Sequence, residues 1–155
     1  MRQPKAYLET TFFNFCFAED AAEKWRDTLA LLEEIQAGKY KPYTSAYVVQ
    51  ELRRASEPQK GQMMGLIKKN RITVLPTGPE AERLADIYIA EGMISQKHIT
   101  DALHIAVATV HDLDFIVSLN FKHIVKRKTM TMTEGINLRE GYKRIGIFSP
   151  AEVIE

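Results

Sequence analysis

The stretch TDALHIAVATVHDLDFIVSLN, residues 100–120, decides the fold of this chain. Its first half carries apolar side chains nearly all the way round a helix, which predicts a helix buried on all sides. Thr100 is expected to cap that helix, with Asp101 as its first residue. Residues 115–118 are continuously apolar, as in a strand buried on both faces of a parallel sheet. The stretch therefore predicts a buried helix followed by a parallel strand.

The rest of the chain alternates in the same way. Further strands are expected at residues 5–8, 43–44, 72–75 and 145–148. Apolar side chains recur at helical spacing in residues 25–35, 48–52, 63–67 and 84–88, with Ser45 as the cap of the second helix. The polar segment 126–137 is expected to be a linker-like excursion. Strands alternating with helices predict an α/β fold whose parallel sheet is covered on both faces.

Length and composition limit the class of protein. The 155 residues predict one domain, residues 1–155. The formal net charge of +1 provides no global attraction for nucleic acid, so a local patch would have to bind it. A single cysteine, Cys16, excludes an intrachain disulfide and a cysteine-based zinc site. No segment is apolar enough to act as a signal peptide or membrane span, so we expect a cytoplasmic protein without a membrane partner.

Four oxygen-bearing side chains are expected to meet at one edge of the sheet. Glu9 follows the first strand, and Asn120 follows the strand at residues 115–118. Asp101 begins the helix that precedes this strand and runs antiparallel to it. Glu51 lies about two turns into a helix that leaves the same edge. Open α/β sheets bind ligands at the carboxyl ends of their strands, so this edge is the candidate site.

The chemistry of this cluster points to a divalent cation. Neighbouring carboxylates repel one another, and a cation removes that repulsion. With oxygen ligands only, Mg²⁺ or Mn²⁺ is expected. Glu9, Glu51 and Asp101 are the predicted metal ligands, and Asn120 completes the predicted catalytic set. A metal held there can polarise a phosphoryl oxygen and orient a water, which suggests hydrolysis of a phosphodiester.

Four stretches together carry a family resemblance: YLETT (7–11), SAYVVQEL (45–52), DALHIAVA (101–108) and IVSLNFKHI (116–124). The chain resembles the PIN-domain family, especially the toxin ribonucleases of VapC type. The resemblance implies a three-layer α/β/α sandwich with a five-stranded parallel sheet. It also implies a metal-dependent endoribonuclease for single-stranded RNA. Toxins of this type belong to type II toxin–antitoxin pairs, are blocked by a small antitoxin and often form homodimers.

Compared with that family, the candidate site departs at two positions. Glu51 and Asp101 match the second and third acidic residues. Glu9 stands where the family usually has Asp, so the carboxylate is kept but displaced by one methylene. Asn120 stands where a fourth Asp is common, which removes one negative charge. One metal is expected to bind, and a second only weakly. His104 shares a helix face with Asp101 and is expected to be a satisfied histidine at the core margin.

Residues around the cluster are expected to support it. By resemblance, Thr10 or Thr11 is the hydroxyl residue that holds the loop after the first acid. Lys122 and His123 directly follow the Asn120 turn and are predicted to contact substrate. Together with the basic residues at 126–128, they form a local positive stretch suited to an RNA backbone.

Two other interpretations remain open. The departures at Glu9 and Asn120 favour a PIN-like RNA-binding or protein-interaction module whose nuclease site has decayed. A metal-dependent phosphatase on a related sheet is the third interpretation, but no Asp-x-Asp pair follows the first strand. A metal titration separates the nuclease from the decayed module, because only the nuclease requires the cation.

Overall fold

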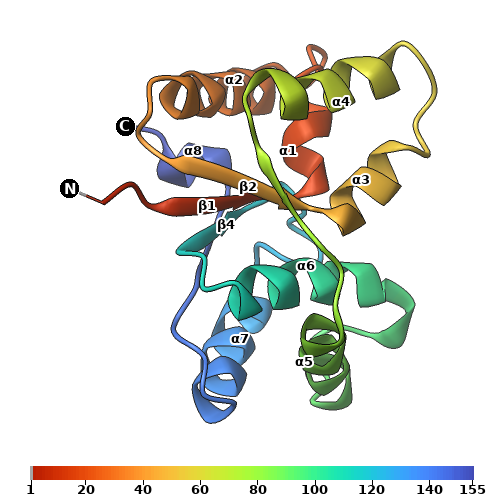
Figure 1. Cartoon of the computed structure of the whole chain (residues 1–155), viewed down its shortest axis with the longest axis vertical. Helices are drawn as coiled ribbons and strands as arrows, with labels where there is room; N and C mark the ends of the chain where they lie inside the picture. The colour runs from red at the N-terminus through yellow and green to blue at the C-terminus, as the bar shows by residue number, and fades with distance from the viewer. Residues whose placement is uncertain (1) are drawn as a thin grey trace.

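The computed structural model describes residues 2–155, which build a five-stranded sheet (Figure 1). The strands are β1 (Lys5–Leu8), β2 (Lys41–Ser45), β3 (Thr73–Leu75), β4 (Phe115–Val117) and β5 (Gly146–Phe148). They lie in the order β3-β2-β1-β4-β5, and each neighbouring pair is parallel. The predicted parallel sheet is therefore confirmed.

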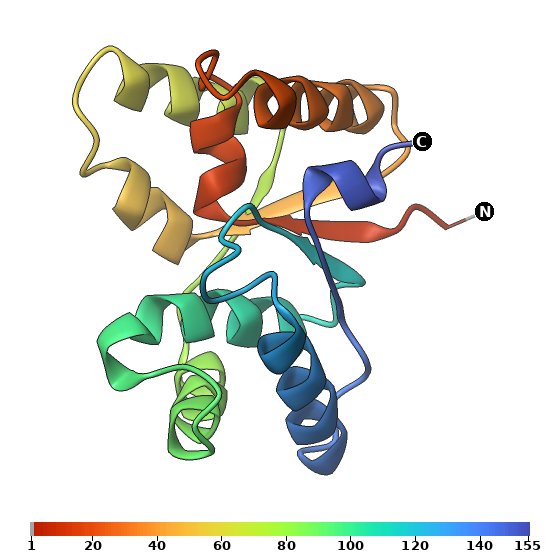
Figure 2. The same cartoon turned by 180° about the vertical axis from the view of Figure 1, so that it is seen from behind.

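Helices cover both faces of this sheet. They are α1 (Thr10–Phe15), α2 (Ala22–Gln36), α3 (Ala46–Leu52), α4 (Gln59–Lys69), α5 (Pro79–Ala90), α6 (Ile99–Val110), α7 (Arg127–Arg139) and α8 (Pro150–Val153). Figures 1 and 2 show α1, α2 and α4 on one side of the sheet and α5, α6 and α7 on the other. The short α8 packs against α2. This is the expected three-layer α/β/α arrangement.

The segment 126–137 is a helix and not the expected linker-like excursion. Most of it belongs to α7, whose buried face consists of Thr129, Thr133, Ile136 and Asn137. These positions have helical spacing, but three of the four side chains are polar. Thr129 and Asn137 place their polar atoms in hydrogen bonds to other parts of the chain. Hydrophobic periodicity did not reveal α7, because most of the buried side chains of this helix are polar and form hydrogen bonds.

The start of α6 also differs from the expectation. A short 3₁₀ turn (Gln96–His98) leads into the helix, which begins at Ile99 with His98 as its N-cap. Thr100 therefore lies inside the first turn and does not cap the helix. By contrast, the predicted cap of α3 is confirmed, because Ser45 Oγ accepts a hydrogen bond from the Val48 N–H at 3.4 Å.

The two central strands position the candidate site. β1 and β4 are paired with Leu8 opposite Val117, and both side chains are fully buried. The pairing continues one step further, since the Glu9 N–H donates to the Val117 carbonyl at 3.1 Å. Both strands thus end at the same level, where α3 leaves β2 and where α6 begins. Buried apolar strands hold this edge rigidly under the polar residues that follow them.

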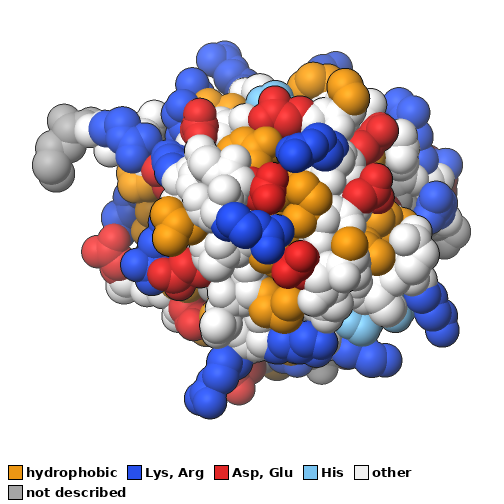
Figure 3. Space-filling view, turned by 90° about the horizontal axis from the view of Figure 1, so that it is seen from below, with side chains coloured by type: hydrophobic (Ala, Val, Ile, Leu, Met, Phe, Trp, Pro, Cys, Tyr) orange, Lys and Arg blue, Asp and Glu red, His pale blue; other side chains and the backbone are white. Residues whose placement is uncertain are grey.

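The far face of the molecule, formed by α5 and α7, is mixed in charge. Figure 3 shows Lys and Arg side chains interspersed with Asp and Glu on this face. Ion pairs such as Arg83–Glu140 and Arg139–Glu91, each at 3.4 Å, are part of that pattern. Among residues 2–155, no helix combines the length and the apolar character needed to cross a bilayer.

Candidate functional site

Glu9 is a carboxylate buried at the carboxyl edge of the sheet, with 3% of its surface exposed. Its Oε1 accepts hydrogen bonds from Thr11 Oγ1 at 2.7 Å and from Ser118 Oγ at 2.5 Å. Burial raises the pKa of Glu9 above its usual value, although the charge of His104 and the two hydroxyls oppose this. Burial therefore disfavours the ionised form of Glu9, and a nearby cation would stabilise it.

Glu51 faces Glu9 from the last turn of α3. Its Oε1 accepts a hydrogen bond from Thr10 Oγ1 at 2.5 Å and lies 2.6 Å from His104 Nε2. Burial would raise the pKa of Glu51, but the hydrogen bond and charge of His104 outweigh it and hold this pKa below its usual value. Ligand atoms of Glu9, Glu51 and His104 all lie within 4.8 Å of one another. We call these three residues the acidic group.

A chain of hydrogen bonds fixes His104 beneath Glu51. The imidazole is fully buried, and its Nδ1 lies 2.7 Å from Tyr7 Oη, which in turn lies 2.7 Å from Ser45 Oγ. Burial lowers the pKa of His104, but its hydrogen bond to Glu51 and the nearby carboxylates produce a net rise. The interpretation of His104 as a satisfied buried histidine is confirmed. It also orients a carboxylate of the candidate site.

Asp101 lies in the first turn of α6, next to the loop that follows β4. Its Oδ1 accepts a hydrogen bond from Asn120 Nδ2 at 3.2 Å, and Asn120 Oδ1 accepts one from the His123 N–H at 3.0 Å. Burial raises the pKa of Asp101, against the charges of His104 and His123. Asn120 therefore touches Asp101 through its amide nitrogen, while a backbone N–H engages its amide oxygen.

The predicted acids occupy two adjoining groups. Ligand atoms of Asp101, His98 and His123 also lie within 4.8 Å of one another, and we call these residues the histidine pair group. Within residues 2–155, Glu9, Glu51 and Asp101 do not together meet that distance. The charge of Glu51 nevertheless contributes to the raised pKa of Asp101. The two groups are thus electrostatic neighbours at one edge of the sheet.

The predicted substrate contacts lie just beyond Asn120. Lys122 is exposed, and so are the basic residues at 126–128, which enter the first turn of α7. His123 is half-buried, and its ring stacks on that of His98 with centroids 3.9 Å apart and planes inclined by 29°. Burial, with a contribution from the neighbouring His98, lowers the pKa of His123. This favours its neutral imidazole form.

Comparison with known proteins identifies the family. The model of the PIN domain matches residues 6–126, most of the chain. The chain belongs to the PIN-domain family. Its fold is similar to that of a chain in the crystal structure of VapBC2 from Rickettsia felis bound to a promoter DNA fragment. The TM-score is 0.57 at 13% identity, covering 94% of this chain and 98% of the other. No curated protein matches it.

PIN domains are in general nucleases, and the residues of this one fit a divalent cation. Among residues 2–155, no lysine or arginine lies within ion-pair distance of Glu9, Glu51 or Asp101. Buried carboxylates without a cationic partner are costly, and oxygen donors of this kind suit hard divalent metals. Glu51 is paired with His104, whereas in residues 2–155 Glu9 and Asp101 have no ion pair. The site of this PIN domain therefore has the oxygen donors for such an ion and negative charge that the ion would offset.

Sequence reasoning missed three polar residues that hold the carboxylates of this PIN domain. Ser118 donates to Glu9 and also accepts the Asn120 N–H at 3.0 Å. Tyr7 and Ser45 support His104 from β1 and the end of β2. Ser118 had a signal, since it ends an apolar strand two positions before Asn120. Tyr7 had none, because an aromatic residue in a buried strand reads as core.

Proposed function

We propose that this chain is a Mg²⁺- or Mn²⁺-dependent endoribonuclease that hydrolyses phosphodiesters of single-stranded RNA. The observation that carries the proposal is the meeting of Glu9 and Glu51 at the carboxyl edge of the sheet. In the described part of the chain, neither carboxylate forms an ion pair with a lysine or arginine. Asp101 adds a third carboxylate from the adjoining group. The nuclease character of the PIN-domain family supports the same reaction class.

In this proposal, Glu9, Glu51 and Asp101 would hold the cation directly or through water. The bound ion would supply Lewis-acid chemistry at the scissile phosphate. Thr11 donates to Glu9 and also accepts the Leu119 N–H at 2.7 Å, so it joins the two loops that carry the site. Thr10, at the start of α1, donates a hydrogen bond to Glu51. These hydroxyls keep the carboxylates aimed at a common position without neutralising them.

Asn120, Lys122 and His123 have different roles in the same proposal. Asn120 acts as a positioning residue, because its amide nitrogen donates to Asp101. Lys122 neutralises phosphates of the bound strand, together with the exposed basic residues at 126–128. His123 contacts substrate at the rim, beside Asp101. A local positive segment beside the acids thus compensates for the small net charge of the whole chain.

The proposed physiological setting is a type II toxin–antitoxin pair in the cytoplasm. A structural neighbour is a chain from the structure of VapBC2, which supports a small antitoxin as the partner of this chain. A homodimer is part of the proposal, since toxins of this type often associate. We expect expression of the wild type to arrest cell growth. Expression of the Asp101→Asn variant in its place should not.

The decisive test is metal-linked stability together with RNA cleavage. Saturating Mn²⁺, at about 100 times its Kd, should stabilise the wild type by about 2.7 kcal/mol and raise its Tm. Asp101→Asn and Glu51→Gln should abolish both this shift and the cleavage of a labelled single-stranded oligoribonucleotide, with unchanged far-UV circular dichroism. Asp86→Asn, on the exposed side of α5, is the matched control and should behave as the wild type. Wild-type cleavage by Asp101→Asn would refute the assignment.

One observation favours the decayed PIN-like module as the second candidate. The fourth position provides no charge, and the amide oxygen of Asn120 already accepts a hydrogen bond from the His123 N–H. Under this alternative, the chain binds RNA or protein without cleaving it. The alternative predicts no Mn²⁺-dependent shift in the wild type, with retained binding of single-stranded RNA in EDTA.

A further inference from the structure

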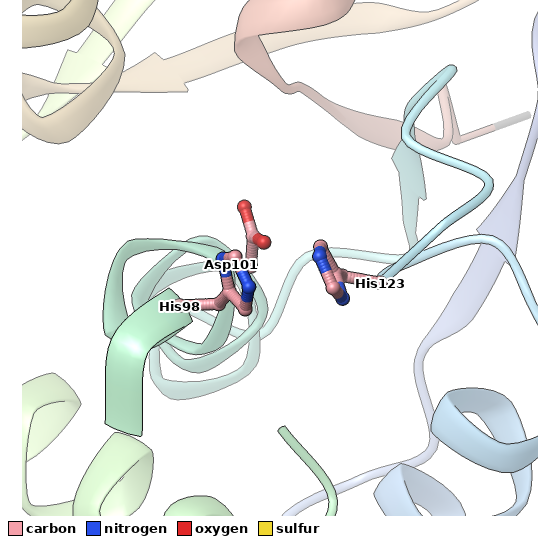
Figure 4. A group of neighbouring side chains, drawn as sticks. All are labelled: His98, Asp101 and His123. Carbon is pink, nitrogen blue, oxygen red and sulfur yellow. The ribbon is translucent and has the colours of Figure 1, made fainter. Parts of the chain in front are cut away.

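His98, Asp101 and His123 converge at the entrance to α6. His98 is the N-cap of the helix, and Asp101 follows three positions later on the same face. His123 approaches from the loop after β4 (Figure 4). One ligand atom from each side chain lies within 4.8 Å of the other two, and the two rings are stacked. His123 thus meets two residues that lie 22 and 25 positions before it in the chain, and the three present two imidazoles and a carboxylate to one another.

The backbone around both histidines is anchored. The His98 N–H donates to the Ser95 carbonyl at 2.9 Å. The His123 N–H donates to Asn120 Oδ1 at 3.0 Å, and its carbonyl accepts from Thr129 Oγ1 at 2.7 Å. Within residues 2–155, by contrast, no hydrogen bond reaches a ring nitrogen of either histidine. Imidazole nitrogens are the commonest metal ligands in proteins, and both of these half-buried rings keep their nitrogens unengaged in the described residues.

We propose that His98, Asp101 and His123 form a zinc-binding site distinct from the acidic group. Two imidazole nitrogens and one carboxylate oxygen suit Zn²⁺, with a water in the fourth position, better than they suit Mg²⁺. Tetrahedral Zn²⁺ with bonds near 2.0–2.1 Å needs ligand atoms roughly 3.3 Å apart. The ligand atoms now lie within 4.8 Å of one another, so rotation of the side chains, including unstacking of the two rings, would bring them to this spacing.

Asp101 belongs both to this site and to the proposed nuclease site. A carboxylate engaged by zinc at the histidine pair is less available to the cation near Glu9 and Glu51. Zinc therefore opposes Mn²⁺-dependent cleavage, a consequence that rests on the proposed function. Loss of either histidine should relieve this inhibition. The zinc site itself does not depend on cleavage and is tested without RNA.

The test is calorimetric titration of the EDTA-treated full chain with Zn²⁺, followed by Co²⁺ as a spectroscopic probe. The wild type should bind one Zn²⁺ and, with Co²⁺, should show the intense visible absorption of a tetrahedral site. His98→Ala and His123→Ala should each weaken Zn²⁺ binding by about tenfold or more. His111→Ala removes an exposed histidine from the other end of α6 and should leave binding unchanged. Circular dichroism verifies that each variant is folded.

A second variant separates this proposal from the nuclease proposal. Glu9→Gln alters the acidic group alone, so its Zn²⁺ affinity should equal that of the wild type. Equal Zn²⁺ affinity in the wild type and both histidine variants would overturn the zinc site, as would loss of binding in Glu9→Gln alone. If RNA is never cleaved while the histidine variants still lose zinc, the nuclease proposal fails and the zinc site stands.

Discussion

At the scale of single residues, the groups that neutralise a carboxylate distinguish Asp114 from the candidate ligand Asp101. Burial would raise the pKa of Asp114, but Arg2, the Lys5 N–H and Lys143 bind it and hold this pKa well below its usual value. Asp101 has no such cation, and burial raises its pKa. Hydroxyl and amide donors stabilise an anion only in part, so Asp101 retains charge that a metal can neutralise.

The contact between Asn120 and Asp101 leads to the first prediction. Asn120→Asp replaces an amide donor by a second carboxylate beside Asp101 Oδ1. Repulsion should destabilise the metal-free protein by about 1 kcal/mol. The added charge should also tighten Mn²⁺ binding. Calorimetric titration with Mn²⁺, and urea unfolding in EDTA, measure the two effects. Unchanged or weaker Mn²⁺ affinity would show that position 120 faces away from the cation.

At the scale of elements, α6 serves both groups of ligands. Asp101 lies in its first turn, toward the loop after β4, and His104 lies one turn later, toward Tyr7 and Glu51. The remaining buried side chains of the helix are almost all apolar, and they pack against the sheet and α5. Dense packing of this kind permits little rotation of the helix. The position of α6 therefore sets both ligand groups at once.

A comparison of two variants within α6 tests this dependence. His104→Phe keeps a ring but removes the hydrogen bonds to Glu51 and Tyr7, which should cost about 2–4 kcal/mol of stability. It should also weaken Mn²⁺ binding about tenfold, because Glu51 loses its orienting partner. Urea unfolding and Mn²⁺ titration are the measurements.

The matched control lies about one and a half turns further along the same helix. Thr109→Val removes a buried acceptor of the Asn137 amide, whose nitrogen lies 3.1 Å from Thr109 Oγ1. It should destabilise the protein by about 1–2 kcal/mol and leave Mn²⁺ affinity unchanged. Equal losses of affinity in the two variants would mean that general loosening of α6, and not the His104–Glu51 contact, weakens the site.

At the scale of the whole molecule, the site gives the metal-free protein a distinctive dependence on pH. Burial raises the pKa values of Glu9 and Asp101, so the folded state holds their protons more tightly than the unfolded state. The raised pKa of His104 acts with the same sign: its stabilisation is complete below 6.5 and is lost as pH rises through the folded value. By contrast, Glu51 and Asp114, with their lowered pKa values, contribute stability that is lost on acidification. The lowered pKa of His123 acts with this same opposite sign, at pH values below 6.5.

We therefore predict that the metal-free protein loses stability as the pH is raised from mildly acidic to alkaline. Glu9→Gln should flatten this decline, because the neutral amide needs no deprotonation. Mn²⁺ should restore the stability of the wild type at pH 8 and have little effect at pH 5. Urea unfolding in EDTA or Mn²⁺ across this range provides the measurement. A wild type whose stability rises steadily toward pH 8 without metal would contradict the assigned charges.

Particular elements show how far sequence reasoning reached. The apolar periodicity of α6 and the apolar run of β4 are local patterns that short-range backbone geometry turns directly into a buried helix and strand. The polar buried face of α7 has no such pattern, so its helix was missed. Glu9, Glu51 and Asp101 were placed near one edge by topology, which requires only the order of the elements.

The sequence by itself thus determined the architecture and the edge at which the polar residues gather, because periodicity is local and the alternation of strands and helices follows the chain. Only the tertiary structure decided which side chains touch. The pairing of His104 with Glu51, the hold of Ser118 on Glu9 and the stacking of His98 on His123 join residues 25 to 109 positions apart. Such contacts depend on strand register and helix packing to within a fraction of a bond length, and no short stretch of sequence encodes them.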